Sequence, residues 1–365
     1  MSKRVKVLEM LPSLNYGGSQ TMIVNLCSAM GRDEVQYDFI IDHEGMMAMA
    51  PIVESLGAKI YVMPTFKGTN LKEITDAWNA FFDEHPEYSI IHSHSRSYAS
   101  IYLEIAKKHG LKTIIHSHNT SNGKGFGSMV KSILQLPLRR IADYFFACSR
   151  EAGEWLFGSR IVEGDRFYVI NNSVDTDRFG YDEKKREEYR TLFNLADEKV
   201  FIQIGRMAKQ KNYLFTLDVF AGYLKKDETA KLFIVGDGEM EKEIRDRIKE
   251  LKIEDSVVIL QHRHDVESLL QMADVFLMPS LYEGLSVAAI EAQTSGIEVL
   301  CSDQVDRNVN VTGLCEFLPL EKEIWIARMS EKIKERRSWK KEVTSAGFDV
   351  RTNAEWLKEF YKRIV

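Results

Sequence analysis

Apolar residues follow two alternating patterns along most of the chain. Short, nearly continuous runs rich in Val and Ile are typical of strands that are buried on both faces of a parallel sheet. Between these runs, apolar residues recur at helical spacing, which predicts helices that cover such a sheet. Up to residue 170 the predicted elements are Val5–Leu11, Gln20–Met30, Tyr37–Ile41, Ile52–Leu56, Lys59–Val62, Leu71–Phe82, Ile90–His92, Tyr98–Lys108, Thr113–His116, Met129–Ile141, Tyr144–Cys148, Arg150–Phe157 and Phe167–Ile170.

The same alternation resumes after a polar, turn-rich segment at 171–179. The predicted strands there are Val200–Ile204, Lys231–Val235, Val257–Leu260, Val275–Met278 and Val299–Cys301, and helices are predicted at Val287–Thr294 and Asn353–Ile364. A length of 365 residues accommodates two domains of ordinary size. The predicted fold class is therefore α/β, with two parallel sheets.

The amino-acid composition limits the classes of partner and the cellular compartment that suit this protein. The net charge of −5 argues against nucleic acid as the main partner. Four cysteines at scattered positions, without a CxxC pair, fit a reducing cytoplasm and no structural zinc. The start of the chain carries no apolar signal region, and no apolar run reaches membrane-spanning length. We therefore expect a cytoplasmic protein whose only membrane contact would be peripheral.

The stretch 278–302 predicts a strand–turn–helix unit with an anion site. Ser286 is a suitable N-cap for the helix that follows it, and Gly296 suits the end of that helix. The amides of Leu285, Ser286 and Val287 would point out of the helix amino terminus, where the helix dipole favours phosphate.

Two glutamates flank this predicted anion site. Glu283 precedes it in the turn, and Glu291 lies about 7.5 Å beyond Ser286 along the helix axis, at ~1.5 Å per residue. A carboxylate, an anion site and a second carboxylate in line suit the sugar, diphosphate and ribose diol of a nucleotide sugar. The alternative is a strand–turn–helix unit with two solvated glutamates.

The residues around these glutamates resemble a known signature. Glu283-Gly284-Leu-Ser, Glu291-Ala, Gly296 and Ser302-Asp303 resemble the donor-site signature of the retaining glycosyltransferases of family 4, which have the GT-B fold. The resemblance implies two Rossmann-like domains facing across a cleft, at 1–178 for the acceptor and 179–342 for the nucleotide sugar, with a C-terminal helix at 343–365 crossing back to the first. It also implies that Glu283 approaches the transferred sugar and that Glu291 binds the ribose.

A second resemblance lies at the start of the second predicted sheet. A strand ending in Gly205-Arg206, with Lys211-Asn212 at the next helix start, resembles the diphosphate clamp of the family. The leaving diphosphate gains negative charge as the glycosidic bond breaks, and Arg206 and Lys211 are suited to neutralise it. With these cations, and without an evident DxD-like carboxylate pair, we expect no metal and no cofactor. A solvated basic loop is the alternative.

Three glycines and an arginine are further expected to contact the donor. Gly17 and Gly18 open a helix after the first strand, although the GxGxxG dinucleotide fingerprint is absent. Gly236 stands in a similar turn, and for both turns the alternative is a tight turn without a ligand. Arg263 matches the position that meets the nucleobase in the family, but Gln261 replaces the usual glycine there.

Four histidines lie at the carboxyl ends of two predicted strands, in Ile91-His-Ser-His94 and Ile115-His-Ser-His-Asn119. Ligands of parallel sheets bind at such ends. Zinc is disfavoured because His-x-His alternation on a strand turns the two rings to opposite faces, and no cysteine lies near. In the family a histidine just after the second of these strands contacts the donor sugar. Alignment favours His118 for this position, with His116 as the alternative.

The segment from Lys107 to Arg140 is basic and partly apolar, and Gly123, Gly125 and Gly127 predict a mobile loop within it. Such a segment can lie on an anionic membrane face, at the inner side of the cell membrane, or it can hold an anionic acceptor. A core helix with solvated lysines is the alternative.

The resemblance implies a reaction as well as a fold. It implies transfer of a hexosyl or aminohexosyl group from a nucleotide diphosphate sugar, with UDP as the default, to a saccharide or lipid-linked saccharide acceptor with retention. The pattern Asn310-Val-Thr-Gly with Phe317-Leu-Pro-Leu resembles a subgroup that builds bacterial capsular and exopolysaccharides. Two alternatives stay open: a catalytically idle GT-B partner subunit, and a UDP-sugar epimerase on the same scaffold, which would need no acceptor.

Overall fold

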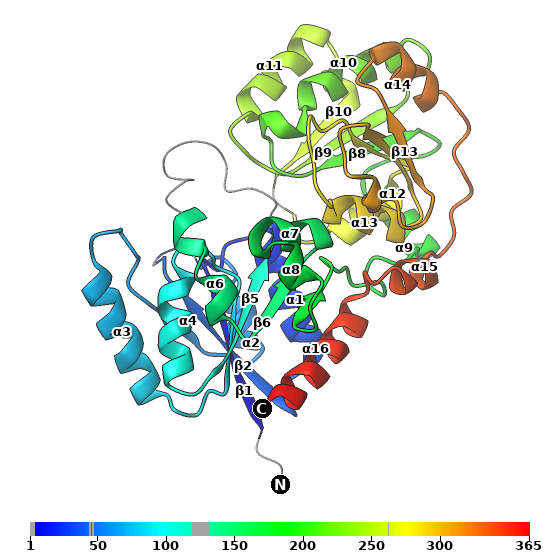
Figure 1. Cartoon of the computed structure of the whole chain (residues 1–365). Helices are drawn as coiled ribbons and strands as arrows, with labels where there is room; N and C mark the ends of the chain where they lie inside the picture. Colours follow the sequence, from blue (N-terminus) through cyan, green and yellow to red (C-terminus); the bar gives the residue numbers. More distant parts are fainter. Residues whose placement is uncertain (1–3, 44, 46, 119–131, 262) are drawn as a thin grey trace. The chain divides into compact units, whose positions relative to one another are not determined.

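Two units make up the chain in the computed structural model, which describes residues 4–43, 45, 47–118, 132–261 and 263–365 (Figure 1). The first unit comprises Met1–Ser173 together with Val350–Val365, and the second comprises Val174–Asp349. The chain therefore changes unit at Ser173 and at Asp349, where the sequence placed the changes at 178 and 342. Val174 and Asp349 pair as a parallel bridge, and the Val174 amide donates to the Phe348 carbonyl at 2.8 Å. The outgoing and returning segments thus lie side by side within the second unit.

A seven-stranded parallel sheet forms the centre of the first unit, in the order β3-β2-β1-β4-β5-β6-β7. Its strands are β1 (Val5–Leu11), β2 (Val35–Ile41), β3 (Ile60–Val62), β4 (Ile90–Ser93), β5 (Lys112–Ser117), β6 (Tyr144–Ala147) and β7 (Phe167–Val169). The central strands are nearly continuous apolar runs because helices cover both faces. The strand order changes direction between β1 and β4, and ligands of such sheets bind at the carboxyl ends beside that point.

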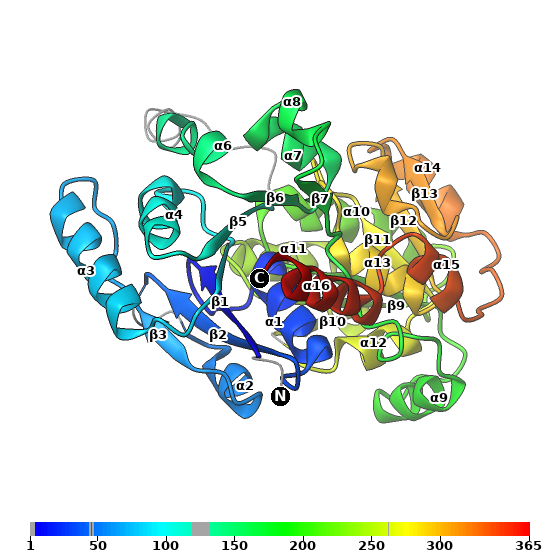
Figure 2. The ribbon, with the colours of Figure 1, turned by 60° about the horizontal axis from the view of Figure 1, so that its bottom comes forward.

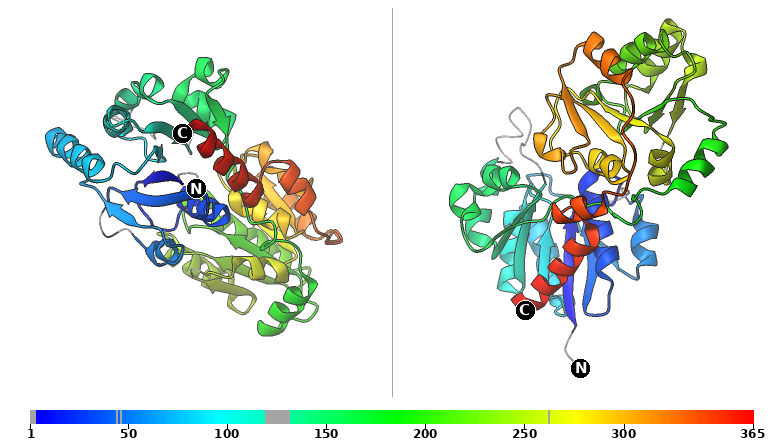
Figure 3. Two further views of the ribbon diagram at one scale, coloured as in Figure 1. Left: turned by 90° about the horizontal axis from the view of Figure 1, so that it is seen from below. Right: turned by 90° about the vertical axis from the view of Figure 1, so that its right-hand side faces the viewer.

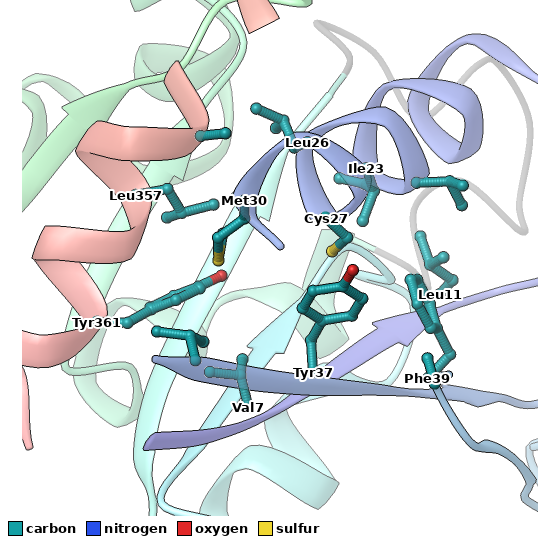
Figure 4. Close-up of a cluster of buried hydrophobic side chains, with 14 of the residues drawn as sticks. Val7, Leu11, Ile23, Leu26, Cys27, Met30, Tyr37, Phe39, Leu357 and Tyr361 are labelled. Carbon is teal, nitrogen blue, oxygen red and sulfur yellow. The ribbon is translucent and has the colours of Figure 1, made fainter. Parts of the chain in front are cut away.

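Helices from both ends of the chain cover the first sheet. One face carries α1 (Gly18–Met30), α2 (Ala50–Ser55) and α16 (Val350–Ile364); the other carries α3 (Leu71–Glu84), α4 (Ala99–Lys108), α6 (Leu138–Ile141) and α7 (Arg150–Phe157), with α8 (Ser159–Val162) leading to β7 (Figure 2). The red α16 lies against the blue α1 in Figure 3. Leu357 and Tyr361 reach from α16 into the core beside Met30 and Cys27 of α1 (Figure 4). The last helix thus belongs to the core of the first unit.

A six-stranded parallel sheet forms the centre of the second unit, in the order β10-β9-β8-β11-β12-β13. Its strands are β8 (Val200–Ile204), β9 (Lys231–Val235), β10 (Val257–Leu260), β11 (Val275–Met278), β12 (Glu298–Ser302) and β13 (Cys315–Leu318). One face packs against α9 (Glu183–Leu192), α12 (Val266–Met272), α13 (Val287–Thr294) and α15 (Lys340–Ser345), the other against α10 (Tyr213–Leu224), α11 (Glu241–Leu251) and α14 (Lys322–Met329). Here the order changes direction between β8 and β11.

The predicted α/β class with two Rossmann-like parallel sheets is confirmed. Helix α1 begins at Gly18 rather than Gln20, and α16 begins at Val350 rather than Asn353. The helix predicted at Met129–Ile141 lies partly outside the described residues, and its described end includes α6. Within the described part of the chain, each helix is either too short or too polar to cross a membrane.

Candidate functional site

The loop from β11 to α13 carries Glu283 and ends at a helix amino terminus. The Glu283 carbonyl accepts from the Asp306 amide at 3.1 Å, and the Tyr282 carbonyl accepts from Gln210 Nε2 at 2.9 Å, so the loop is tied to two neighbouring segments. Ser286 takes the N-cap position with an extended backbone, yet its side chain makes no capping bond. The amides that begin α13, at Leu285–Val287, therefore lack the usual serine cap, and an anion can take its place.

Lys211 and Glu283 form an ion pair at this loop. Lys211 Nζ lies 2.7 Å from Glu283 Oε2, and both side chains are 17% exposed. The Ser280 hydroxyl donates to the same oxygen at 3.3 Å. Lys211 reaches Glu283 because the short 3₁₀ helix η1 (Lys209–Lys211) follows β8, whose neighbour in the sheet is β11. The structure thus joins two residues that the sequence had assigned to different parts of the donor.

Close backbone packing explains the glycines after β8 and β9. Gly205 and Gly236 have positive φ values of 146° and 139°. A Cβ on Gly236 would lie 2.2 Å from the Gly205 carbonyl oxygen, and a Cβ on Gly205 would lie 3.1 Å from Lys211 Cε. Packing alone therefore demands glycine at 236, and its contact with the donor stays a prediction. At Gly284, in contrast, an added Cβ would meet no atom within 4 Å.

The two predicted arginines each contact a carboxylate, Arg206 one in the turn after β9 and Arg263 one in its own turn. The side chain of Arg206 is 74% exposed and lies 3.0 Å from Glu239 Oε2. Arg263 makes a bidentate pair with Asp265, at 2.8 and 2.6 Å. Arg263 also follows the edge strand β10, which β9 separates from β8. The structure thus brings Lys211 and Glu283 together and places Arg263 two strands away from β8 and three away from β11.

Glu291 lies on α13, past the amino-terminal amides. Burial raises the pKa of the Glu291 carboxyl to about 7, and the charge of Arg178 opposes this rise. Arg178 is itself paired with Glu267 of α12 at 2.8 Å. A carboxyl that titrates near neutral pH is typical of binding and catalytic sites, and its ionised form accepts hydrogen bonds from a diol.

The predicted residues of the first unit gather at the end of three adjacent strands. Gly17 caps α1 after β1 with an extended backbone, and a Cβ on Gly18 would meet no atom within 4 Å. His118 follows β5, stacks on His116 at 4.1 Å between ring centroids and places Nε2 2.9 Å from Nδ1 of His94. His116 is 1% exposed, whereas His118 is half-buried. Access therefore favours His118 over His116.

The expected separation of the histidine rings is wrong. The rings of His92 and His94 lie 4.3 Å apart, because residues two positions apart on a strand point to the same face and only successive residues point to opposite faces. One ring nitrogen each of His92, His94 and His116 lies within 4.8 Å of the other two, a spacing that could hold a metal ion. Five of their six ring nitrogens form hydrogen bonds, to one another, to His118, to Glu9 and to Tyr361. These contacts describe a hydrogen-bonded cluster, and the absence of metal stays a prediction.

Glu9 and Tyr361 are the residues of this cluster that the sequence did not point out. Glu9 is 1% exposed in the middle of β1. The available signal was a carboxylate inside a mostly apolar strand. Tyr361 was hidden in the ordinary apolar face of α16, and its hydroxyl meets Glu9 across 352 residues of sequence.

The described part of the basic segment holds several of its cations in local contacts. Lys107 pairs with Asp143 at 2.6 Å, Lys108 pairs with Glu104 at 3.0 Å, and Arg139 donates to the Leu156 carbonyl. Ile133 and Leu136 are 58% and 56% exposed. Gly123, Gly125 and Gly127 lie outside the described residues. Contact of this segment with a membrane or an acceptor stays a prediction.

Two Rossmann-like parallel sheets in two units, the second with the strand–turn–helix unit of β11 and α13, are the architecture of the GT-B class of glycosyltransferases. The family profile Glycosyltransferase Family 4 matches residues 16–178, and the profile Glycosyl transferases group 1 matches residues 185–312. The chain belongs to glycosyltransferase family 4.

Similar proteins support the same assignment over the whole chain. EpsF of Bacillus subtilis, which is named as a glycosyltransferase, is 30% identical over 99% of this chain and 97% of its own. UDP-Gal:alpha-D-GlcNAc-diphosphoundecaprenol alpha-1,3-galactosyltransferase of Escherichia coli is 26% identical over 60% of this chain and 58% of its own. The crystal structure of Anabaena HepE with UDP-glucose matches with a TM-score of 0.75 at 18% identity, covering 99% of this chain and all of HepE, and shows the fold alone.

Proposed function

We propose that this protein transfers a hexosyl or aminohexosyl group from a UDP-sugar to a saccharide or lipid-linked saccharide acceptor, with retention at the anomeric carbon. The process it would serve is exopolysaccharide or capsule biosynthesis. The observation that carries the proposal is the Lys211–Glu283 ion pair beside the uncapped amino terminus of α13. Family membership and the similarity to EpsF and to the diphosphoundecaprenol-dependent galactosyltransferase support it.

The proposed catalytic contribution is stabilisation of the leaving diphosphate. The amides of Leu285, Ser286 and Val287 donate hydrogen bonds to the oxygens of the diphosphate, and Lys211 supplies a positive charge beside them. These contacts strengthen as the C–O bond breaks and negative charge develops on UDP, so they lower the barrier rather than only binding the substrate. Arg206, exposed on the turn after β8, adds a bidentate cation when it exchanges Glu239 for phosphate.

The proposed roles of the remaining residues concern orientation. Glu283, fixed by Lys211, accepts hydrogen bonds from the sugar hydroxyls, and Glu291 accepts them from the ribose diol. His118 contacts the sugar, as the family resemblance implies. Gly17, Gly18, Gly236, Gly284 and Arg263 remain proposed donor contacts. The mechanism uses no metal and no cofactor.

The proposed place of action is the cytoplasmic face of the cell membrane, where a lipid-linked acceptor would be met. Exposed Ile133 and Leu136 support this, because they adjoin a basic stretch of sequence. Apolar side chains beside cations are typical of surfaces that rest on anionic lipid.

A thermal-shift and turnover experiment on the full chain tests the proposal. UDP is expected to raise the unfolding midpoint more than GDP or ADP does, because a ligand that binds only the folded state stabilises it. Incubation with individual UDP-sugars and a lipid-linked saccharide is expected to yield a product with the anomeric configuration of the donor, read by NMR. No shift with any nucleoside diphosphate would instead favour an idle partner subunit. Isomerised donor appearing without acceptor would favour an epimerase.

A further inference from the structure

Glu9 connects the core of the first unit to His118. Its Oε2 lies 2.9 Å from His94 Nε2, and its Oε1 accepts from the Tyr361 hydroxyl at 2.9 Å. His94 in turn places Nδ1 2.9 Å from Nε2 of His118. An unbroken line of hydrogen bonds therefore runs from a buried carboxyl group to the carboxyl end of β5.

A second branch fixes which oxygen of Glu9 can carry a proton. The single hydroxyl proton of Tyr361 is donated to Oε1, so the Tyr361 oxygen accepts from His92 Nδ1 at 2.5 Å. His92 Nε2 then accepts from His116 Nδ1 at 3.3 Å. Oε1 is accordingly an acceptor, and a proton on Glu9 belongs on Oε2, where it faces His94.

We propose that Glu9 is a positioning residue that decides, through His94, whether His118 Nδ1 donates or accepts a hydrogen bond. With Glu9 ionised, His94 donates from Nε2 to Glu9 and accepts at Nδ1 from His118, so His118 carries its proton on Nε2 and a lone pair on Nδ1. With Glu9 protonated, Oε2–H donates to His94, and His94 Nδ1–H donates to His118. The proton of His118 is then on Nδ1.

The two arrangements differ by one proton. With Glu9 ionised, His94 and His118 carry one proton each. With Glu9 protonated, the same three residues carry a third proton, which lies on Glu9. A proton that arrives at His118 Nδ1 is matched by transfer of the His118 Nε2 proton to His94 and of the His94 Nε2 proton to Glu9. Both rings stay neutral throughout, as burial requires: it lowers the pKa of His94 well below its ordinary value and the pKa of His118 to about 3.

The groups that face Glu9 favour its protonated form up to mildly alkaline pH. They are Cys27 of α1, Tyr37 of β2, His92 of β4, His94 just after β4, His116 of β5 and Tyr361 of α16. Burial raises the pKa of both phenols and the thiol and lowers that of the imidazoles, so these groups are neutral near pH 7. The positive charge of Arg32 opposes the rise in the pKa of Cys27 and Tyr37, and Arg32 is itself paired with Asp38 at 3.3 Å. Burial accordingly raises the pKa of Glu9 to about 8, and the Tyr361 bond opposes the rise.

The consequence for the donor rests on the proposed function, in which His118 contacts the sugar. An N–H on His118 Nδ1 donates to an oxygen of the bound donor, whereas a lone pair there does not. Turnover of a UDP-sugar is therefore expected to fall as the pH rises through about 8 and Glu9 ionises.

Imidazole ¹⁵N NMR of the full chain tests the hydrogen-bond line without substrate, because nitrogen shifts distinguish an N–H from a lone pair. The His118 signals are assigned by their loss in His118→Gln. The His118 proton is expected on Nδ1 near pH 6.5 and on Nε2 near pH 9.5, about 1.5 units either side of the midpoint. In Glu9→Gln the amide N–H replaces Oε2–H as donor to His94, so the Nδ1–H form persists at both pH values. No change in the wild type, or the same change in Glu9→Gln, overturns the proposal.

Two variants serve as controls. Tyr361→Phe removes a hydrogen bond that lowers the pKa of Glu9, so the midpoint is expected to rise while the change itself remains. Glu34→Gln, at an exposed ion pair with Lys362 of α16, is expected to leave the midpoint unaltered.

In turnover assays the alkaline decrease is expected in the wild type and absent in Glu9→Gln. An alkaline decrease that survives in Glu9→Gln overturns the link to the donor. A wild type that turns over no UDP-sugar contradicts the proposed function instead. The NMR result then decides, without substrate, whether Glu9 sets the position of the His118 proton.

Discussion

Glu283 of the second unit and Glu9 of the first unit lie in opposite electrostatic settings. In the second unit, Glu283 lies 2.7 Å from the Lys211 ammonium group, and both side chains keep some contact with solvent. In the first unit, Glu9 is fully buried among imidazole, phenol and thiol groups that carry no charge, and its pKa rises to about 8. The comparison teaches that a neutral hydrogen-bond donor does not offset the desolvation of a carboxylate, so Glu9 favours its protonated form near neutral pH, whereas Glu283 has an ionic partner.

Removal of the cation gives the largest expected effect. Lys211→Ala leaves Glu283 without its ionic partner and removes a positive charge from the proposed diphosphate site. We expect kcat/KM for UDP-sugar transfer to fall about 100-fold or more, in line with the loss of one transition-state contact. Lys209→Ala, at an exposed lysine of the same 3₁₀ helix, is the matched control and is expected to keep wild-type turnover. Equal turnover of both variants would show that the ion pair is structural.

The neutral setting of Glu9 predicts a pH-dependent stability. The folded-state pKa of about 8 lies above the ordinary glutamate value of 4.5, so the folded chain binds an extra proton between these values and the unfolding free energy falls as the pH rises through that window. Glu9→Gln removes this loss, and we expect the variant to gain on the order of 4 kcal/mol over the wild type between pH 5 and pH 9. Urea unfolding at the two pH values measures the difference. A parallel decline in both proteins would show that Glu9 is ionised in the fold at pH 5 or is solvated.

Glu291 tests whether a carboxyl of the second unit also titrates. Its pKa of about 7 predicts that UDP affinity rises roughly 5- to 10-fold from pH 6 to pH 8, because the ionised form accepts from the ribose diol. Glu291→Gln is expected to weaken UDP binding about 10-fold at pH 8 and to abolish the pH dependence. Isothermal titration calorimetry measures both effects, with exposed Glu188→Gln as the control. A variant with wild-type affinity would remove the ribose contact from the proposal.

The smallest expected effect concerns the exposed apolar pair of the first unit. Ile133→Asp with Leu136→Asp is expected to lower binding to vesicles of anionic phospholipid about 2- to 3-fold, because two apolar side chains leave the interface and two negative charges enter it. Cosedimentation measures the bound fraction. Leu192→Asp, at a similarly exposed position on α9, is the control from the second unit. Equal loss in both would exclude a contact specific to the 133–136 surface.

Hydrophobic periodicity predicted most strands because central strands of a covered parallel sheet are continuous apolar runs. Val200–Ile204, Lys231–Val235, Val257–Leu260 and Val275–Met278 have the predicted bounds. The unit boundaries differed by several residues because they depend on a long-range pairing, between Val174 and Asp349, which local sequence does not encode. Glu298, a buried carboxylate at the start of β12, is explained only by the fold, since Arg328 and Lys334 reach it at 2.8 and 3.2 Å.

The site was predicted as separate residues and not as pairs. The sequence identified Glu283, Lys211 and His118 as site residues. The contacts that define their environments are long-range: Lys211 and Glu283 are 72 residues apart, and His94, which contacts His118, is 85 residues from Glu9. Strand order creates both contacts, and strand order is not readable from periodicity. The prediction about histidine alternation was wrong because it applied the alternation of successive strand residues to residues two positions apart, which share a face.

The core of the first unit is completed by a helix that follows the whole second unit in the sequence. Helix α16 supplies Leu357 and Tyr361 to the core formed around β1 and α1, while the second unit is contiguous from Val174 to Asp349. During synthesis the sheet of the first unit therefore leaves the ribosome with an apolar face lacking its final helix, and the whole second unit emerges before that helix arrives. Chaperones that shield apolar surface would meet this nascent chain at its amino-terminal half, and release would await the final helix.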